Sequence, residues 1–169
     1  AYTLTLNEMQ QKVVDAVLEN ARTEQKPCLI HGVTGSGKTE VYMELIAEAA
    51  GRGKQSIVLI PEIALTYQTV MRFYHRFGDR ISIMNSKLSP GERSDQFERA
   101  KKGEIDVMIG PRSALFTPFS NLGYIIIDEE HEGTYKSETI PRYHARETAI
   151  ERARMSGATV ILGSATPSI

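Results

Sequence analysis

The hydrophobic pattern of the chain alternates between amphipathic stretches with helical spacing and short apolar runs. The first helical stretch begins after Asn7, which can cap it, and Gln10 can complete a capping box there. One face of this stretch is apolar and is formed by Val13, Val14, Val17 and Leu18. The chain is therefore predicted to open with an amphipathic helix.

Further helices are each predicted to end at a glycine, just past the last apolar turn, where a left-handed residue is favoured. They run from 38 to Gly51, from 64 to Gly78, from about 90 to Gly103, and over about 144–156 to Gly157. The helix from about 90 also has a full start signal: Ser89 as cap, Pro90 in the first turn and Glu92 as the capping carboxylate.

The short apolar runs between the helices are β-branched and are bounded by turn residues. They cover 28–31, 56–60, 81–84, 106–109, 124–127 and 159–162. Because they are apolar on both faces, they are typical of buried parallel strands. Strands alternating with helices predict an α/β fold with three layers, a mostly parallel sheet flanked by helices. Ligands of such folds bind beyond the carboxyl ends of the strands.

Composition narrows the function classes only a little. The 169 residues suit one domain, and 41% hydrophobic with 24% charged residues is ordinary for a globular protein. A net charge of −1 excludes a strongly basic protein but leaves room for a local basic loop. The single cysteine, Cys28, excludes an internal disulfide and a cysteine zinc cluster, and is interpreted as a small buried hydrophobe. With neither a signal peptide nor a membrane-length apolar span in the sequence, the cytoplasm is the expected compartment.

A phosphate-binding motif follows the first predicted strand: Gly32-Val33-Thr34-Gly35-Ser36-Gly37-Lys38-Thr39 fits G-x-x-x-x-G-K-[ST]. Strand, glycine loop and helix follow one another as a P-loop requires. Backbone N–H groups of such a loop surround phosphate oxygens, Lys38 reaches the β- and γ-phosphates, and Thr39 ligates Mg²⁺. The alternative is a glycine-rich turn without a ligand. The flanking elements favour a nucleoside triphosphate site.

A second chemical signal is the strand 124–127, which runs into Asp128-Glu129-Glu130-His131. In a Walker B element, Asp128 would hold Mg²⁺ through water and Glu129 would orient or deprotonate the attacking water. The alternative is an acidic turn in solvent.

A third signal lies near the end of the sequence, where Ser164 and Thr166 follow another buried strand. Their hydroxyls can bridge the tip of that strand to His131. The alternative is a plain small-residue turn.

These motifs together resemble those of superfamily 2 helicases. Residues 128–131 are similar to a DEAD/DEAH box and 164–166 to motif III, and the bacterial replication-restart helicases match over almost the whole chain. The matching strings are 6–10, 32–42, 61–66, 112–119, 128–131, 135–136, 142–146 and 162–167. The resemblance implies a RecA-like lobe that uses ATP and Mg²⁺, with Lys38, Asp128, Glu129 and His131 as the catalytic set.

The resemblance also implies roles for residues that the pattern alone does not explain. Gln10 would read the adenine, a role compatible with its capping box. Thr66 would contact DNA phosphates, as would Arg112 and Ser113, although an arginine can instead anchor a loop by an ion pair. The segment 132–146 would be an aromatic-rich loop that couples DNA contact to hydrolysis, unless its tyrosines pack on the core. Its candidate residues are Tyr135, Lys136, Arg142, Tyr143, His144 and Arg146.

We therefore expect residues 1–169 to be one RecA-like lobe excised from a larger bacterial helicase. The resemblance implies that the parent protein also has a second lobe with arginine fingers and, elsewhere, a zinc-binding part. The partners it implies are single-stranded or forked DNA, restart proteins and single-strand-binding proteins, and it implies no membrane. The isolated lobe is expected to hydrolyse ATP negligibly. The alternative interpretations are a lobe of a recombination or restriction translocase, a P-loop kinase, a nucleotide-gated binding module without catalysis, and an inert fragment.

Overall fold

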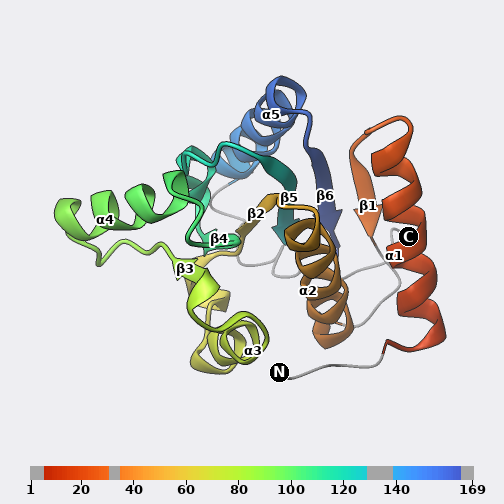
Figure 1. Cartoon of the computed structure of the whole chain (residues 1–169), viewed down its shortest axis with the longest axis horizontal. Coiled ribbons are helices and arrows are strands. Elements are labelled where there is room, and N and C mark those ends of the chain that lie inside the picture. The colour runs from red at the N-terminus through yellow and green to blue at the C-terminus, as the bar shows by residue number, and fades with distance from the viewer. Residues whose placement is uncertain (1–5, 31–34, 129–138, 165–169) are drawn as a thin grey trace.

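A parallel sheet lies at the centre of the structure (Figure 1). The computed structural model describes residues 6–30, 35–128 and 139–164, with only the backbone for 35, 36 and 139–144. Within these ranges, the strands pair in the order β1-β6-β5-β2-β4-β3, and every pairing is parallel. They are β1 (Cys28–Ile30), β2 (Gln55–Leu59), β3 (Ile81–Ile83), β4 (Val107–Gly110), β5 (Leu122–Asp128) and β6 (Thr159–Gly163). The predicted α/β class with a mostly parallel sheet is confirmed.

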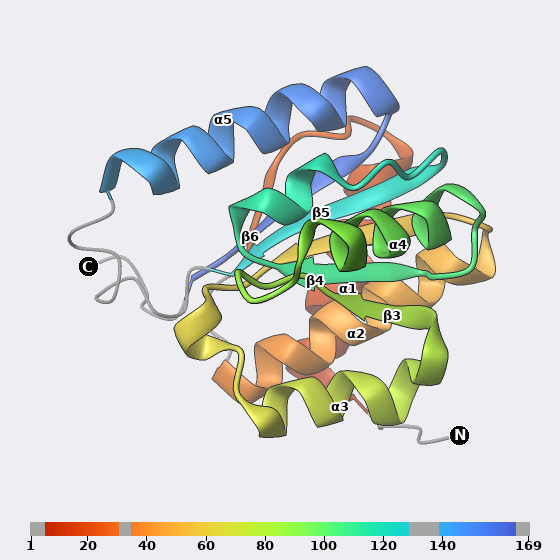
Figure 2. The same cartoon turned by 90° about the vertical axis from the view of Figure 1, so that its left-hand side faces the viewer.

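Helices cover both faces of this sheet (Figure 2). One face packs against α1 (Glu8–Arg22), α2 (Gly35–Gly51) and α3 (Tyr67–Phe77), and the other against α4 (Pro90–Lys101) and α5 (Thr139–Ser156). The helix α5 buries alanines, so it lies close to the sheet, whereas α2 buries large side chains. Three short 3₁₀ segments link these elements: η1 (Glu62–Ala64), η2 (Gly78–Arg80) and η3 (Arg112–Phe116).

Most of the predicted helix ends are found in the structure. Asn7 and Ser89 cap α1 and α4, each within a complete capping box, and Gly78, Gly103 and Gly157 have φ values of 58°, 74° and 75°. The prediction for Gly51 is wrong, because Gly51 is still helical and Gly53 has the positive φ of 74°. Three predicted helix starts are also wrong. The helix α2 begins at Gly35 rather than at 38, because the last residues of the phosphate-binding motif already form its first turn. The helix α3 begins after Thr66 rather than at 64, because η1 precedes it, and α5 begins at Thr139 rather than near 144.

Burial of the strands depends on their place in the sheet. The strands β4 and β5 are buried along their whole length, and β2 along all but its first residue, as predicted from their apolar runs. At the edge, however, Leu29 of β1 is 57% exposed. The prediction that this strand is buried on both faces is wrong, because α5 does not extend over β1 and the described residues place no helix there.

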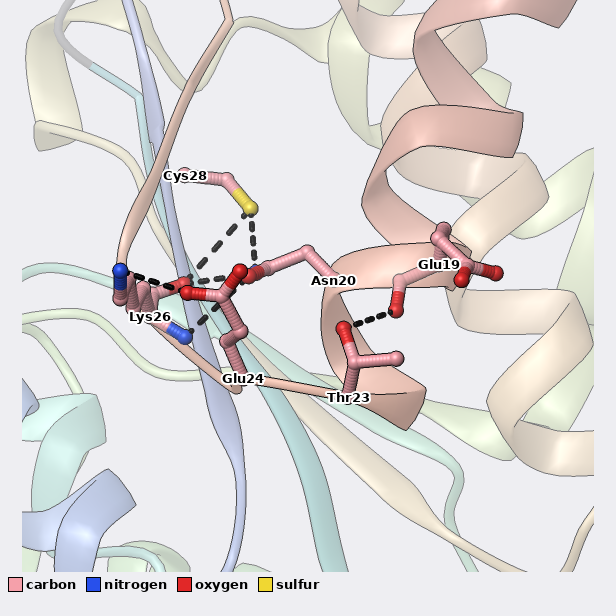
Figure 3. Close-up of polar contacts among 6 residues, drawn as sticks. All are labelled: Glu19, Asn20, Thr23, Glu24, Lys26 and Cys28. Atoms are coloured by element: carbon pink, nitrogen blue, oxygen red, sulfur yellow. Dashed lines mark hydrogen bonds and ion pairs between the residues drawn. The ribbon is translucent and has the colours of Figure 1, made fainter.

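The connection between α1 and β1 is held by the side chain of Asn20 (Figure 3). Its amide donates to the Lys26 carbonyl at 2.7 Å and to the Cys28 sulfur, while its carbonyl oxygen accepts from the Lys26 backbone at 3.3 Å. Burial raises the pKa of the Cys28 thiol, and the Asn20 amide partly offsets this effect. Cys28 was predicted to be a small buried hydrophobe, but it is half-buried and its sulfur accepts a hydrogen bond from Asn20.

Because every strand pairing is parallel, the carboxyl ends of the strands lie along one edge of the sheet, which we call the C-terminal rim. The phosphate-binding segment follows β1, Thr66 follows β2, η3 follows β4, Asp128 ends β5 and Ser164 follows β6. The fold therefore gathers the chemically suggestive stretches on one side. Among the described helices, none has the length and apolar character needed to span a membrane.

Candidate nucleotide-binding site and the neighbouring motifs

Lys38 lies in the first turn of α2 and is 1% exposed. Within the described residues its ammonium has no hydrogen-bond partner, and its charged neighbour is Asp128, with 4.0 Å between Nζ and Oδ1. A buried ammonium without hydrogen bonds is costly unless another group satisfies it. At the N-terminus of a helix, phosphate oxygens suit that role. The residues present therefore fit a nucleotide.

Asp128 supplies the carboxylate of this site. It is the last residue of β5 and is 6% exposed, and Oδ1 accepts a hydrogen bond of 3.1 Å from the hydroxyl of Tyr42. The hydroxyl of Thr39, half-buried next to Lys38 on α2, completes the oxygen donors expected for Mg²⁺. Lys38 and Asp128 were both predicted from sequence motifs 90 positions apart, and the structure brings them together.

Gln10 joins α1 to the start of α2. Its side-chain oxygen accepts from the Asn7 backbone at 2.8 Å, which completes the predicted capping box. Its amide nitrogen donates to the Gly37 carbonyl at 3.2 Å and to the Glu40 carboxylate at 2.8 Å. The capping role is confirmed and Gln10 lies next to the P-loop helix, while adenine reading stays a prediction.

The third motif begins where β6 leaves the sheet. The Ser164 backbone N–H donates to the carbonyl of Ile30 at 2.9 Å, which links the end of β6 to the end of β1. Ser164 itself is half-buried. Thr166 and His131, the other members of the predicted bridge, lie outside the described residues, so that bridge stays a prediction.

Thr66, a predicted DNA contact, is the exposed N-cap of α3. Its hydroxyl accepts from the Thr69 backbone at 3.2 Å. Next to it, Ile63 and Tyr67 are among the most exposed large apolar side chains of the described chain. Sequence reasoning did not single out either one.

The segment η3 carries the other two predicted DNA contacts. Arg112 is exposed and, within the described residues, no ion pair holds it; the DNA contact and the anchoring alternative both stay predictions. Ser113 is half-buried. The loop is anchored by Arg152 of α5, whose guanidinium donates to the carbonyls of Leu115 and Thr117, the latter at 2.6 Å. Nothing in the sequence distinguished Arg152 from other helical arginines.

Several predicted residues lie outside the described ranges: Gly32, Thr34, Glu129, His131, Tyr135, Lys136 and Thr166. Gly35 and Ser36 begin α2. The aromatic-rich segment was expected to be a loop as far as 146, yet α5 begins at Thr139. Arg142, Tyr143 and His144 therefore lie on a helix, together with the half-buried Arg146.

The parallel sheet with a buried lysine and aspartate at its C-terminal rim defines a nucleotide-binding lobe of the RecA-like class. A model of the DEAD/DEAH box helicase family matches residues 7–169, and the chain belongs to this family. Solved structures agree on the fold. RecG bound to a three-way DNA junction has a TM-score of 0.70 at 21% identity, and the similarity covers 98% of this chain and 22% of that one. A hypothetical ATP-dependent RNA helicase from Sulfolobus tokodaii has a TM-score of 0.66 at 20% identity, covering 97% and 47%.

Curated relatives are similar over nearly the whole chain. Replication restart protein PriA of Bacillus subtilis is 49% identical over 167 residues, which is 98% of this chain and 21% of the relative. The proteins of the same name from Chlamydia trachomatis and Haemophilus influenzae are each 48% identical, over 98% of this chain and 22% of their own length. The chain thus spans about a fifth of the length of these relatives.

Proposed function

We propose that residues 1–169 form the first, ATP-binding lobe of a larger replication-restart DNA helicase. In that protein, ATP hydrolysis would drive 3′→5′ unwinding of DNA at stalled forks and support primosome assembly. The observation that carries the proposal is the buried pair Lys38 and Asp128 at the C-terminal rim, 4.0 Å apart, in a chain 49% identical to a replication restart protein. Such a helicase acts on the chromosome, so the proposal places it in the bacterial cytoplasm.

Each residue of the nucleotide site has a defined task under this proposal. Lys38 and the backbone N–H groups at the start of α2 hold the phosphates. Thr39 and Asp128 would hold Mg²⁺, which would supply positive charge to offset the negative charge that develops on the phosphates. Glu129 orients the attacking water and takes up its proton. His131, with Ser164 and Thr166, passes the nucleotide state to the rest of the lobe.

DNA would meet the exposed side of the same rim. Thr66 on α3 and Arg112 and Ser113 on η3 contact phosphates in this proposal, because each follows the end of a strand of the sheet. The segment 132–146 adds tyrosines and cations that can stack on bases and neutralise phosphates. Single-stranded and forked DNA are the substrates, and restart and single-strand-binding proteins are further partners of the whole protein. Zinc, where present, would belong to another part of that protein.

We also propose that the isolated chain is nearly inactive as an ATPase. In superfamily 2 motors, which this chain resembles, ATP lies between two lobes and the second supplies arginine fingers. An arginine of this kind can contribute on the order of 10³–10⁵ in rate. The isolated lobe would therefore bind nucleotide and turn it over slowly.

The first experiment measures Mg²⁺-ATP hydrolysis and binding of a fluorescent ATP analogue by the isolated chain, with and without single-stranded DNA. Lys38→Ala serves as the blank. We expect Lys38-dependent binding with hydrolysis at the level of the blank. DNA-stimulated turnover above the level of the blank would contradict the proposal that the isolated lobe is nearly inactive, because the site would then be complete without a second lobe.

The second experiment uses the full-length protein to separate a motor from a binding module that does not hydrolyse ATP. Glu129→Gln should leave nucleotide binding intact and reduce DNA-stimulated hydrolysis and fork unwinding by at least about 10²-fold, since the oriented water is lost. Hydrolysis that survives this change would overturn the role of Glu129. If the full-length protein without substitutions binds ATP and DNA but does not hydrolyse ATP, the result would favour the binding module.

A further inference from the structure

The hydroxyl of Tyr42 occupies a confined position between two strands at the C-terminal rim. Tyr42 lies on α2 and is 1% exposed, and its hydroxyl donates to Asp128 Oδ1 at 3.1 Å. A Cβ built on Gly163 would lie 1.7 Å from this hydroxyl oxygen and 2.9 Å from the ring carbon that bears it. The tyrosine tip therefore fills the space that any side chain at 163 would need.

Gly163 and Asp128 are partners across the β5–β6 pairing, so one tyrosine contacts both strands at the same level. The Gly163 backbone limits where the ring can go, and the ring in turn fixes the hydrogen bond to the carboxylate. The orientation of Asp128 thereby depends on the place where β6 leaves the sheet, directly before Ser164.

The helix α2 brings two groups to the same carboxylate oxygen. Lys38 and Tyr42 are four residues apart, on one face of the helix, and both approach Asp128 Oδ1, at 4.0 Å and 3.1 Å. A carboxylate that binds a metal is normally oriented by hydrogen bonds from neighbouring groups. Tyr42 is placed to supply such a hydrogen bond.

We propose that Tyr42 is a positioning residue, which orients the Asp128 carboxylate for Mg²⁺ and ties it to the β6 exit at Gly163. The inference rests on the proposed nucleotide site and extends it. It assigns Tyr42 no contact with the nucleotide itself.

The test compares Tyr42→Phe with Tyr124→Phe in the same chain. Tyr124 is a matched control because it is also fully buried and its hydroxyl also donates to a carboxylate, that of Glu48, at 3.1 Å. It differs in position: Tyr124 precedes Asp128 by four residues on β5, which is roughly 13 Å along the strand. A fluorescent ATP analogue is titrated in Mg²⁺ and in EDTA. For Tyr42→Phe we expect the half-saturating Mg²⁺ concentration to rise about tenfold with binding in EDTA unchanged. Tyr124→Phe should change neither.

A second pair of variants tests the role of Gly163. Gly163→Ala should displace the ring and raise the Mg²⁺ requirement like Tyr42→Phe, whereas Gly51→Ala, which has open space around it, should not. An unchanged Mg²⁺ requirement in Tyr42→Phe, or equal losses in Mg²⁺ and EDTA, would overturn the proposal.

A double-mutant cycle of Tyr42→Phe with Asp128→Ala, which removes the acceptor, in the nucleotide-free chain separates this proposal from the proposed function. If Tyr42 orients Asp128, the unfolding equilibrium constants should depart from additivity by about tenfold. Absence of nucleotide binding by the unsubstituted chain would count against the nucleotide site, and the cycle would still decide the Tyr42–Asp128 link. An additive cycle would overturn that link whatever the nucleotide does.

Discussion

The side-chain amide of Gln10 donates a hydrogen bond of 2.8 Å to the carboxylate of Glu40. The same nitrogen donates to the Gly37 carbonyl, so both of its N–H groups are engaged between α1 and α2. Glu40 also lies 3.7 Å from Arg72 of α3, which extends the connection to a third helix. A purine that bonded to the Gln10 amide nitrogen would have to replace one of these partners.

Replacing Gln10 with Ala should lower the free energy of unfolding by about 1–3 kcal/mol, because buried groups on α2 lose their donor. The matched control is Gln11→Ala, since Gln11 is exposed and its amide bonds only to Asp15 among the described residues. Urea denaturation of both variants measures this difference. If Gln10 also reads adenine, its variant will lose preference for ATP over GTP in competition binding. Equal stability of the two variants would contradict the structural role.

Replacing Lys38 with Met should stabilise the nucleotide-free chain while abolishing nucleotide binding. The ammonium is buried without a hydrogen-bond partner in the described structure, and an apolar side chain of similar length removes that desolvation cost, while Asp128 keeps the hydrogen bond from Tyr42. A gain of about 1 kcal/mol would raise Tm by roughly 2–4 °C in a chain of this size. Scanning calorimetry without nucleotide measures it. A clear loss of stability would mean that the 4.0 Å pair with Asp128 is net stabilising.

Replacing Arg152 with Ala should destabilise the chain by roughly 1–3 kcal/mol and loosen η3. Two carbonyls lose a charged donor, and Thr117, which carries one of them, is fully buried. The control is Arg154→Ala on the same helix, where the side chain is exposed and pairs only with Glu151 among the described residues, so its loss should leave the stability almost unchanged. Hydrogen exchange of residues 112–117 should increase in the first variant alone. Unchanged exchange would show that other contacts hold the loop.

Tyr124 should give the chain a distinct loss of stability in alkali. Burial, together with the Glu48 carboxylate, raises the pKa of Tyr124 from 10.0 to about 12. Between about pH 10 and pH 12, the folded chain therefore keeps the phenol proton of Tyr124, whereas the unfolded chain has lost it. Stability is unaffected below about pH 10 and falls as the pH rises to about 12, by at most about 1.4 kcal/mol per pH unit.

Urea denaturation between about pH 9 and pH 12 measures this slope. Tyr124→Phe should flatten it, while Tyr74→Phe, at an exposed position of α3, should leave it unchanged. The same slope in the unsubstituted chain and in Tyr124→Phe would show that other groups cause the loss.

The sequence predicted the elements, and the meeting of Lys38 with Asp128, because both depend on local patterns. Buried parallel strands are continuous apolar runs, and the P-loop and Walker B residues follow strands at fixed places. The two motifs alone therefore assign Lys38 and Asp128 to one site. The exposure of Leu29 was not predicted, because an apolar run does not reveal whether its strand lies at the centre or at the edge of the sheet.

The residues that sequence reasoning missed act through tertiary contacts. Tyr42 was one apolar position among several on α2, and only the packing of α2 against β5 and β6 shows that its hydroxyl meets Asp128 and Gly163. Arg152 was likewise one of several arginines on α5, and its partners are carbonyls about 35 positions away. Backbone acceptors of this kind leave no mark in side-chain patterns.

The two edge strands of the sheet, β1 and β3, are only three residues long each. An edge strand exposes unpaired backbone groups to which another chain can add, and short edges are one means by which natural sheets resist such aggregation. The four longer apolar strands β2, β4, β5 and β6, which would pair most readily with another chain, all lie inside the sheet. The order of the strands thus keeps the most aggregation-prone segments of this lobe away from neighbouring molecules.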